Sequence, residues 1–91
     1  MTRLESSYEK NFINEVKAVK GIAYKIECPG QRGMVDRLVL LPIPEKHQKI
    51  VNRYIKFVEM KTPAGRLSVH QKRRHKEIEQ RGFTVTINSG D

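Results

Sequence analysis

The sequence contains two carboxylates and a lysine whose side chains could form a metal-dependent catalytic site. Asp36 opens one predicted strand, and Glu59 and Lys61 form a Glu-x-Lys triplet at the end of another. Facing carboxylates repel unless a cation lies between them, and oxygen ligands favour Mg²⁺ or Mn²⁺ over zinc. The main-chain carbonyl of Met60 can add an oxygen. If the two strands are neighbours, the pattern suits metal-assisted hydrolysis of a phosphodiester, with Lys61 beside the attacking water.

Each of these residues also has a simpler interpretation. Aspartate is common where a loop becomes a strand, so Asp36 on its own would be assigned to turn chemistry. A Glu59–Lys61 pair on a solvated strand would be a surface ion pair of little energetic value. The combination of Asp36 with Glu59 and Lys61 favours a metal-dependent catalytic site over these simpler interpretations.

Hydrophobic periodicity and breaker residues predict the elements that would position these side chains. Helices are expected at 4–20, ending at Gly21, and at 68–81, capped by Ser68 and ending at Gly82. The segment 43–54 is polar and fits either a short helix or a hairpin loop. Strands are expected at 22–26, 36–43, 54–61 and 83–87. The order, helix, three strands, helix, strand, predicts one α/β domain, 1–91, with a small mixed β-sheet flanked by helices.

The first predicted helix carries acids inside its apolar stripe. Glu5 and Glu9 fall at helical angles between those of Tyr8, Phe12 and Val16. A buried carboxylate costs several kcal/mol unless a cation or hydrogen bonds compensate, so acids in this position usually have a specific partner. For Glu5, close to the N-terminus, interaction with the helix dipole or with water is an equal alternative.

The charge balance favours an anionic partner. The chain has 18 Lys and Arg against 10 Asp and Glu, a net charge of +8, which points first to nucleic acid. No zinc finger or RNP-type aromatic motif is present, so recognition of backbone and shape is expected rather than of sequence. The residues predicted to contact DNA are Arg32, Arg37, Arg66, Lys72, Arg73, Arg74 and Lys76.

Other classes of protein are disfavoured. The sequence has no apolar run long enough to span a membrane, and its first residues lack the apolar core of a signal peptide. Cys28 is the single cysteine, which excludes an internal disulfide and suits a reducing compartment. We therefore expect an intracellular protein that uses neither a membrane nor a small-molecule cofactor.

Two long stretches resemble a known family. GIAYKIECPGQRGMVDRLVLLP, followed by FVEMKTPAGRLSVHQKRRHKEIEQRGFTV, is similar to the virus-type replication-repair nuclease (VRR-NUC) domain, a branch of the PD-(D/E)xK nuclease superfamily. The resemblance runs from about residue 5 to residue 85. Its motifs occur in the family's order: a Glu-bearing helix, a PG-x-RG-x-x-D loop, ExK, and LS-x-x-Q at the start of the second helix. It implies a restriction-endonuclease-like core.

The resemblance implies roles for individual residues. Asp36 and Glu59 match metal ligands, Lys61 matches the catalytic lysine, and the Met60 carbonyl completes the Mg²⁺ or Mn²⁺ site.

Two further positions match functional residues of the family. Glu9 corresponds best to the first-helix glutamate of related junction resolvases, and Glu5 also fits a glutamate common in the family. Gln71 matches the glutamine of the second helix and would contact the metal-bound water or a phosphate; without the resemblance, a solvent-facing Gln is the better interpretation.

Two departures from the family pattern stand out. Val35 occupies the place where the family usually has Pro, so a rigid metal loop is not implied. The segment IPEKHQKIVNRY replaces a much shorter hairpin turn, a change that bears on dimerisation or on the substrate groove.

Similar stand-alone domains, many from phages, cleave branched DNA such as Holliday junctions as homodimers. By resemblance we expect a metal-dependent, structure-selective DNA endonuclease of this kind, serving DNA repair or a phage in its bacterial host. Two alternatives stay open: a monomeric flap-directed nuclease, and a non-catalytic basic module that binds nucleic acid.

Overall fold

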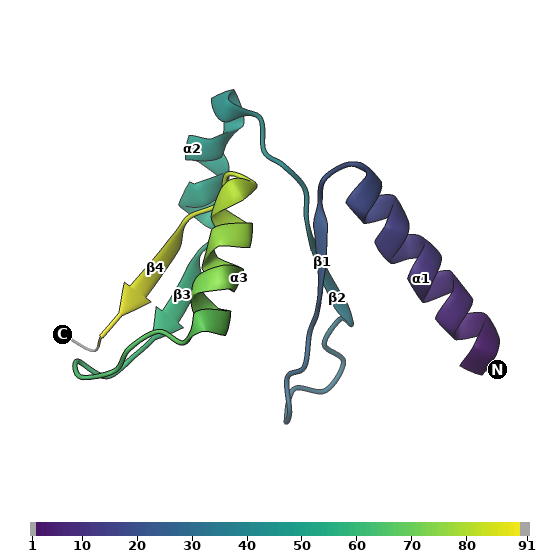
Figure 1. The fold of residues 1–91 in the computed structure, drawn as a ribbon, viewed down its shortest axis with the longest axis horizontal. Helices are drawn as coiled ribbons and strands as arrows, with labels where there is room; N and C mark the ends of the chain where they lie inside the picture. The colour runs from purple at the N-terminus through teal and green to yellow at the C-terminus, as the bar shows by residue number, and fades with distance from the viewer. Residues whose placement is uncertain (1, 90–91) are drawn as a thin grey trace. The chain divides into compact units, whose positions relative to one another are not determined.

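The computed structural model describes residues 2–89, with side chains from residue 7 onward. These residues form two compact units, one from the chain up to Leu41 and the other from Pro42 onward. Among residues 2–89, no helix combines the length and apolar character needed to cross a membrane. The elements, labelled in Figure 1, are α1 (Thr2–Ala18), β1 (Ile22–Lys25), β2 (Arg37–Leu40), α2 (Glu45–Tyr54), β3 (Phe57–Met60), α3 (Val69–Gln80) and β4 (Val85–Asn88).

The first unit joins α1 to a β-hairpin through a tight turn at Gly21. The predicted helix is confirmed, but Lys20 rather than Gly21 takes the left-handed conformation, with φ 63°. The Gly21 amide donates to the Val16 carbonyl at 2.9 Å. A Cβ on Gly21 would come within 2.7 Å of Leu41 Cδ2 and 3.0 Å of the Leu40 carbonyl oxygen. Gly21 is therefore needed for close packing of the helix end on the strand.

Strands β1 and β2 pair antiparallel, with Lys25 directly opposite Arg37. The Ile26 amide donates to the Asp36 carbonyl at 2.8 Å, so the ladder continues to the residue before β2. Gly30 and Gly33 in the connecting loop have φ of 82° and 75°, values that favour glycine. The loop thus delivers Asp36 at the loop end of the hairpin, directly before β2, as the sequence predicted.

The second unit packs α3 on one face of a parallel pair, β3 and β4. The inner residues Ile78 and Phe83 are 8% and 7% exposed, and the Phe83 ring meets Phe57 edge-on at 5.6 Å. Helix α3 follows its prediction: Ser68 caps it, and Gly82 follows it with φ 93°. The strand predicted at 54–61 is shorter than expected, because Tyr54 still belongs to α2.

The prediction of one mixed sheet is wrong for the strand pairing. β1 pairs with β2 and β3 with β4, which makes two two-stranded sheets, one antiparallel and one parallel. β2 and β3 do not form a hairpin, because the ten-residue helix α2 lies between them in the chain. The observed order is helix, two strands, helix, strand, helix, strand, so the protein is α/β as predicted, with one more helix.

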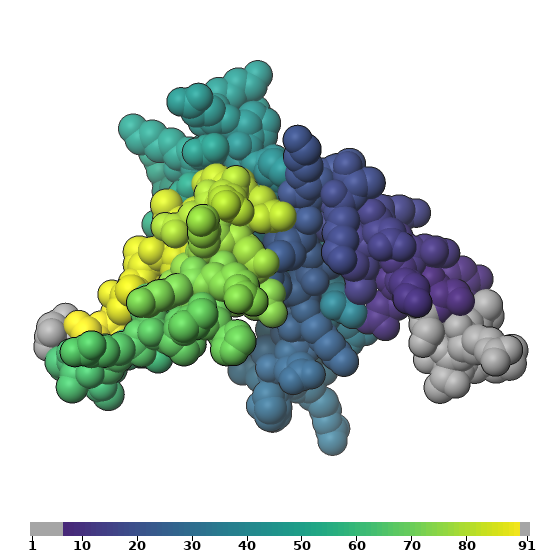
Figure 2. Space-filling model, in the orientation of Figure 1, coloured from purple at the N-terminus to yellow at the C-terminus, as the bar shows by residue number. Residues whose placement is uncertain are grey.

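Helix α2 settles the open assignment of 43–54 in favour of a helix. It has no fully buried residue, and its side chains project from the surface in Figure 2. It is held by polar contacts to the turn between α3 and β4. Asn52 donates from Nδ2 to the Gly82 carbonyl at 2.8 Å and accepts from the Thr84 amide at 3.0 Å. The Asn52 side chain therefore forms hydrogen bonds with two backbone groups that lie 30 and 32 positions further along the chain.

An Asn52→Ala variant should be less stable than the wild type. It removes the partner of the part-buried Gly82 carbonyl and of the exposed Thr84 amide, and the net loss for a typical hydrogen bond that water can replace is about 0.5–1.5 kcal/mol. Urea unfolding should show a lower midpoint with an unchanged slope. Asn14→Ala on the exposed side of α1 is the control. Equal midpoints for Asn52→Ala and the wild type would show that the contacts do not hold α2.

Candidate active site

In the first unit, two of the predicted acids line one hollow. Glu9 from α1 and Asp36 from the hairpin end both border a hollow of about 660 Å³, together with Lys25 and Arg37. Asp36 is exposed, in keeping with its place where the loop becomes β2. The side chain of Glu5 lies outside the described residues, so its predicted role stays a prediction.

Glu9 has the cationic partner that was expected, but its side chain is 52% exposed rather than buried, and its stripe neighbours Tyr8 and Phe12 are exposed as well. Its carboxylate pairs with the Arg37 guanidinium. The Arg37 hydrogen bond and then the Arg37 charge lower the pKa of Glu9, desolvation opposes them, and the Lys25 charge adds a small lowering. Cross-strand neighbours of like charge repel, so Glu9 compensates for the Lys25–Arg37 pairing. Arg37, whose side chain is 22% exposed, was predicted to bind DNA and is here bound to a carboxylate.

The lowered pKa of Glu9 predicts an acid-sensitive contribution to stability. Because the folded-state pKa lies below the ordinary 4.5, the ion pair stabilises the fold above about pH 4.5 and is lost as the pH falls through the folded pKa. Glu9→Gln should therefore be less stable than wild type at pH 7, and the difference should be smaller at pH 3. Urea midpoints without metal at the two pH values measure this. Glu15→Gln, exposed on the same helix, is the control; a Glu9→Gln deficit of the same size at pH 7 and at pH 1.5 would contradict the assignment.

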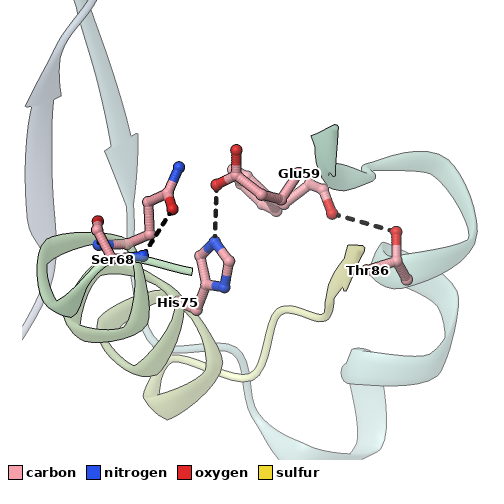
Figure 3. Close-up of polar contacts among 6 residues, drawn as sticks. Glu59, Ser68, His75 and Thr86 are labelled. Atoms are coloured by element: carbon pink, nitrogen blue, oxygen red, sulfur yellow. Dashed lines mark hydrogen bonds and ion pairs between the residues drawn. The ribbon is translucent and has the colours of Figure 1, made fainter. Parts of the chain in front are cut away.

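In the second unit, Glu59 faces α3. Exposure alternates along β3, so that Phe57 and Glu59 are half-buried whereas Val58 and Met60 are exposed. Glu59 Oε1 lies 3.1 Å from His75 Nε2, and the two side chains are 26% and 14% exposed. Figure 3 shows the imidazole directed at the carboxylate. Phe57 and Glu59 lie on the same face of β3, and the carboxylate of Glu59 is accommodated there because His75 of α3 forms a hydrogen bond with it.

Sequence reasoning did not identify a role for His75. The available signal was position: His75 shares the inner stripe of α3 with Gln71 and Ile78. A histidine on an inner stripe facing a strand with one carboxylate has an obvious partner, but only the register of α3 on β3 brings the two together.

The backbone around Lys61 directs the Met60 carbonyl away from β4. The Lys61 amide donates to the Asn88 carbonyl at 2.9 Å, which continues the parallel ladder beyond Met60. Backbone groups alternate between the two edges of a strand, so the Met60 carbonyl points to the edge that β4 does not cover. The same alternation puts Lys61 on the face of Glu59.

Gln71 serves a local purpose that the sequence predictions did not include. Its Oε1 accepts from the Ser68 amide at 2.9 Å, while the Ser68 hydroxyl oxygen accepts from the Gln71 amide at 3.1 Å. This capping box anchors the start of α3. The Gln71 Nε2 group makes no hydrogen bond within the described part of the chain. Gln71 also borders the hollow of about 310 Å³ that Glu59, His75 and Arg74 line, so its amide group is available to a ligand there.

The basic residues predicted to bind DNA differ in their surroundings. Arg74 borders the α3 hollow, and its Nη1 lies 3.2 Å from Glu77 Oε1. Arg37 forms the ion pair with Glu9 described above. The remaining five are exposed: Arg32, Arg66, Lys72, Arg73 and Lys76.

The candidate metal ligands in the two units are carboxylate and carbonyl oxygens, which suit a hard divalent cation. Among the side chains that the structure describes, from residue 7 to residue 89, no three of His, Cys, Asp or Glu gather into a ready cluster. Glu9 and Asp36 share a hollow of the first unit, whereas Glu59, Met60 and Lys61 belong to the second. The convergence of Asp36 and Glu59 on one ion stays a prediction.

A comparison with known proteins finds a relative. The chain is 40% identical over 83 residues to a protein of Acyrthosiphon pisum secondary endosymbiont phage 1 that is named "Putative nuclease p44". The match covers 91% of this chain and 80% of the phage protein. No family model matches the chain, so the resemblance to the VRR-NUC domain stays a prediction. No solved structure matches it.

Proposed function

This chain belongs to the family of the phage p44 protein, and from that premise we propose that it is a metal-dependent nuclease that cuts DNA. The observation that carries the proposal is the 40% identity across 91% of the chain. Identity over this length includes both units, so the proposal concerns the whole chain rather than one motif.

We place the chain in the VRR-NUC branch of the PD-(D/E)xK nucleases, with a restriction-endonuclease-like core. The order of the motifs supports this assignment. The local structure agrees with it: Asp36 follows a glycine loop at the start of β2, and Glu59 lies in β3 with Lys61 just beyond. The Ser68–Gln71 capping box opens α3, as the LS-x-x-Q motif would require.

Asp36, Glu59 and the Met60 carbonyl are the groups that would hold Mg²⁺ or Mn²⁺. When bound, such an ion supplies Lewis-acid stabilisation of the phosphate and a more acidic bound water. The direction of the Met60 carbonyl, away from β4, supports a role for it. Glu9 is the candidate for a further ligand, because it borders the same hollow as Asp36 and its lowered pKa keeps it ionised.

Lys61 and Gln71 would act on the reacting groups. The Lys61 ammonium would hold the attacking water and stabilise the charge that develops on the phosphate. The Gln71 Nε2 group, free of other acceptors in the described chain, would donate to a phosphate oxygen or to the water.

The exposed basic residues would hold the DNA backbone. On α3, Lys72, Arg73 and Lys76 lie on the side away from the buried Ile78 and are exposed. Together with Arg32, Arg66 and Arg74 they would supply phosphate contacts, and such affinity falls steeply with salt. Arg37 would reach DNA only by leaving Glu9.

A branched substrate and a homodimer go together in this proposal. A four-way junction has two symmetric cleavage points, which a two-fold dimer of a small chain matches. We propose Holliday junctions as the substrate on this ground.

A panel of DNA substrates tests the proposal. Purified protein should cut a four-way junction with Mg²⁺ or Mn²⁺, cut flap or linear duplex DNA less well, and cut nothing in EDTA. Sedimentation with and without the junction gives the oligomeric state. A preference for flaps by a monomer would replace the junction hypothesis, and salt-sensitive binding with no cutting under any metal would leave only a DNA-binding module.

A further inference from the structure

In the hydrogen bond between His75 and Glu59, the histidine is the donor. An ionised carboxylate offers no proton, so the imidazole donates from Nε2 to Glu59 Oε1, across 3.1 Å. This bond engages one of the two carboxylate oxygens and leaves Oε2 for another partner. The side chains are 14% and 26% exposed, so water competes poorly for the bond.

The surroundings of His75 restrict its movement. One turn before it, Gln71 forms with Ser68 the capping box that anchors the start of α3. Just beyond it, Ile78 is 8% exposed in the core under α3. The imidazole is therefore carried on a helix that is anchored on both sides of it, and β3 carries its acceptor.

We infer that His75 is a positioning residue that fixes the Glu59 carboxylate for binding of the divalent ion. This inference rests on the proposed function, in which Glu59 is a metal ligand. Ligating carboxylates are commonly held by hydrogen bonds from outer groups, and loss of such a group typically costs 10–100-fold in metal affinity. His75 does not touch the ion in this arrangement; it sets which Glu59 oxygen is available and where it points.

The test compares substitutions at His75 that separate its hydrogen bond from its volume. His75→Phe keeps a ring of similar size but cannot donate, and His75→Gln keeps an N–H group at a similar reach. The readout is the Mn²⁺ dissociation constant of the full chain by calorimetry, without DNA, at constant pH. His70→Ala is the matched control, because His70 lies on the same helix and borders the same hollow.

We expect His75→Phe to weaken Mn²⁺ binding about 10–100-fold, and His75→Gln and His70→Ala to stay near the wild type. Wild-type affinity in His75→Phe would overturn the inference, as would equal losses in His75→Phe and His75→Gln. Thermal melts of the metal-free proteins exclude unfolding as the cause; if His75→Phe does not fold, His75→Leu, which also lacks a donor, replaces it.

A Glu59→Gln protein separates failure of the inference from failure of the proposed function. If the wild type and Glu59→Gln both lack Mn²⁺ binding, the metal site itself is wrong and the inference falls with it. If the wild type binds Mn²⁺ and Glu59→Gln does not, while His75→Phe binds as the wild type does, only the role of His75 is refuted.

Discussion

Lys61→Ala is expected to lower the rate of DNA cutting by about 10²–10³-fold, the usual loss when one group that stabilises transition-state charge is removed. The substitution truncates the ammonium but leaves the backbone amide that donates to the Asn88 carbonyl. The β3–β4 ladder should therefore survive. Single-turnover cutting of a four-way junction with Mg²⁺ measures the effect.

Lys56→Ala is the matched control for this prediction, because Lys56 is an exposed lysine just before β3 and is absent from the proposed site. DNA binding in Ca²⁺ should remain close to the wild type in both variants. If Lys61→Ala cuts as fast as the wild type, the activity comes from a different site or from a contaminant.

Asp36→Asn is expected to lose both Mn²⁺ binding and cutting. Loss of an outer hydrogen bond to a metal ligand already costs 10–100-fold in affinity, so loss of a ligand should exceed that range. Asn keeps the size of Asp36 and its capacity for turn hydrogen bonds, so the hairpin should be preserved. Calorimetry with Mn²⁺ and the junction-cutting assay measure the two losses.

Glu27→Gln, an exposed carboxylate in the same hairpin loop, is the control and should behave as the wild type. Wild-type Mn²⁺ affinity in Asp36→Asn would return Asp36 to the turn chemistry that its position alone suggests. Retention of metal with loss of cutting would instead place Asp36 at the substrate rather than at the ion.

The features that the sequence predicted correctly depend on contacts between near neighbours. The cap of α3 was predicted at Ser68, whose hydroxyl oxygen accepts from the amide of Gln71, three positions further along the chain. Gly82 ends α3 because it accepts a positive φ of 93°. The helical conformation of α1 and the loop glycines before Asp36 belong to the same class. In each case the energy is decided within one or two turns of chain.

The features that the sequence did not predict depend on partners far along the chain. Helix α2 was ambiguous because 43–54 is polar, and the contacts of Asn52 that hold it reach residues 30 and 32 positions away. Strand pairing was wrong for the same reason, since an apolar run does not specify which other strand it joins. A one-residue change of register would also move every side chain to the opposite face.

The same distinction between local and long-range contacts holds for the candidate site. The residue types alone indicate a hydrolytic metal site: Asp36, the Glu59–Lys61 triplet and an acid at Glu9. The structure decided the partners within each unit, Arg37 for Glu9 and His75 for Glu59. Charge and type are properties of single residues, whereas a hydrogen bond needs two groups at one place.

By itself, then, the amino-acid sequence determined an α/β protein with two amphipathic helices and a basic surface, because periodicity, caps and charge act locally. Only the tertiary structure decided that β1 pairs with β2 and β3 with β4, that α2 docks through Asn52, and that His75 holds Glu59. These outcomes require residues 12 to 32 positions apart to meet, from Lys25 opposite Arg37 to Asn52 beside Thr84, and it is the packing of whole elements that brings them together.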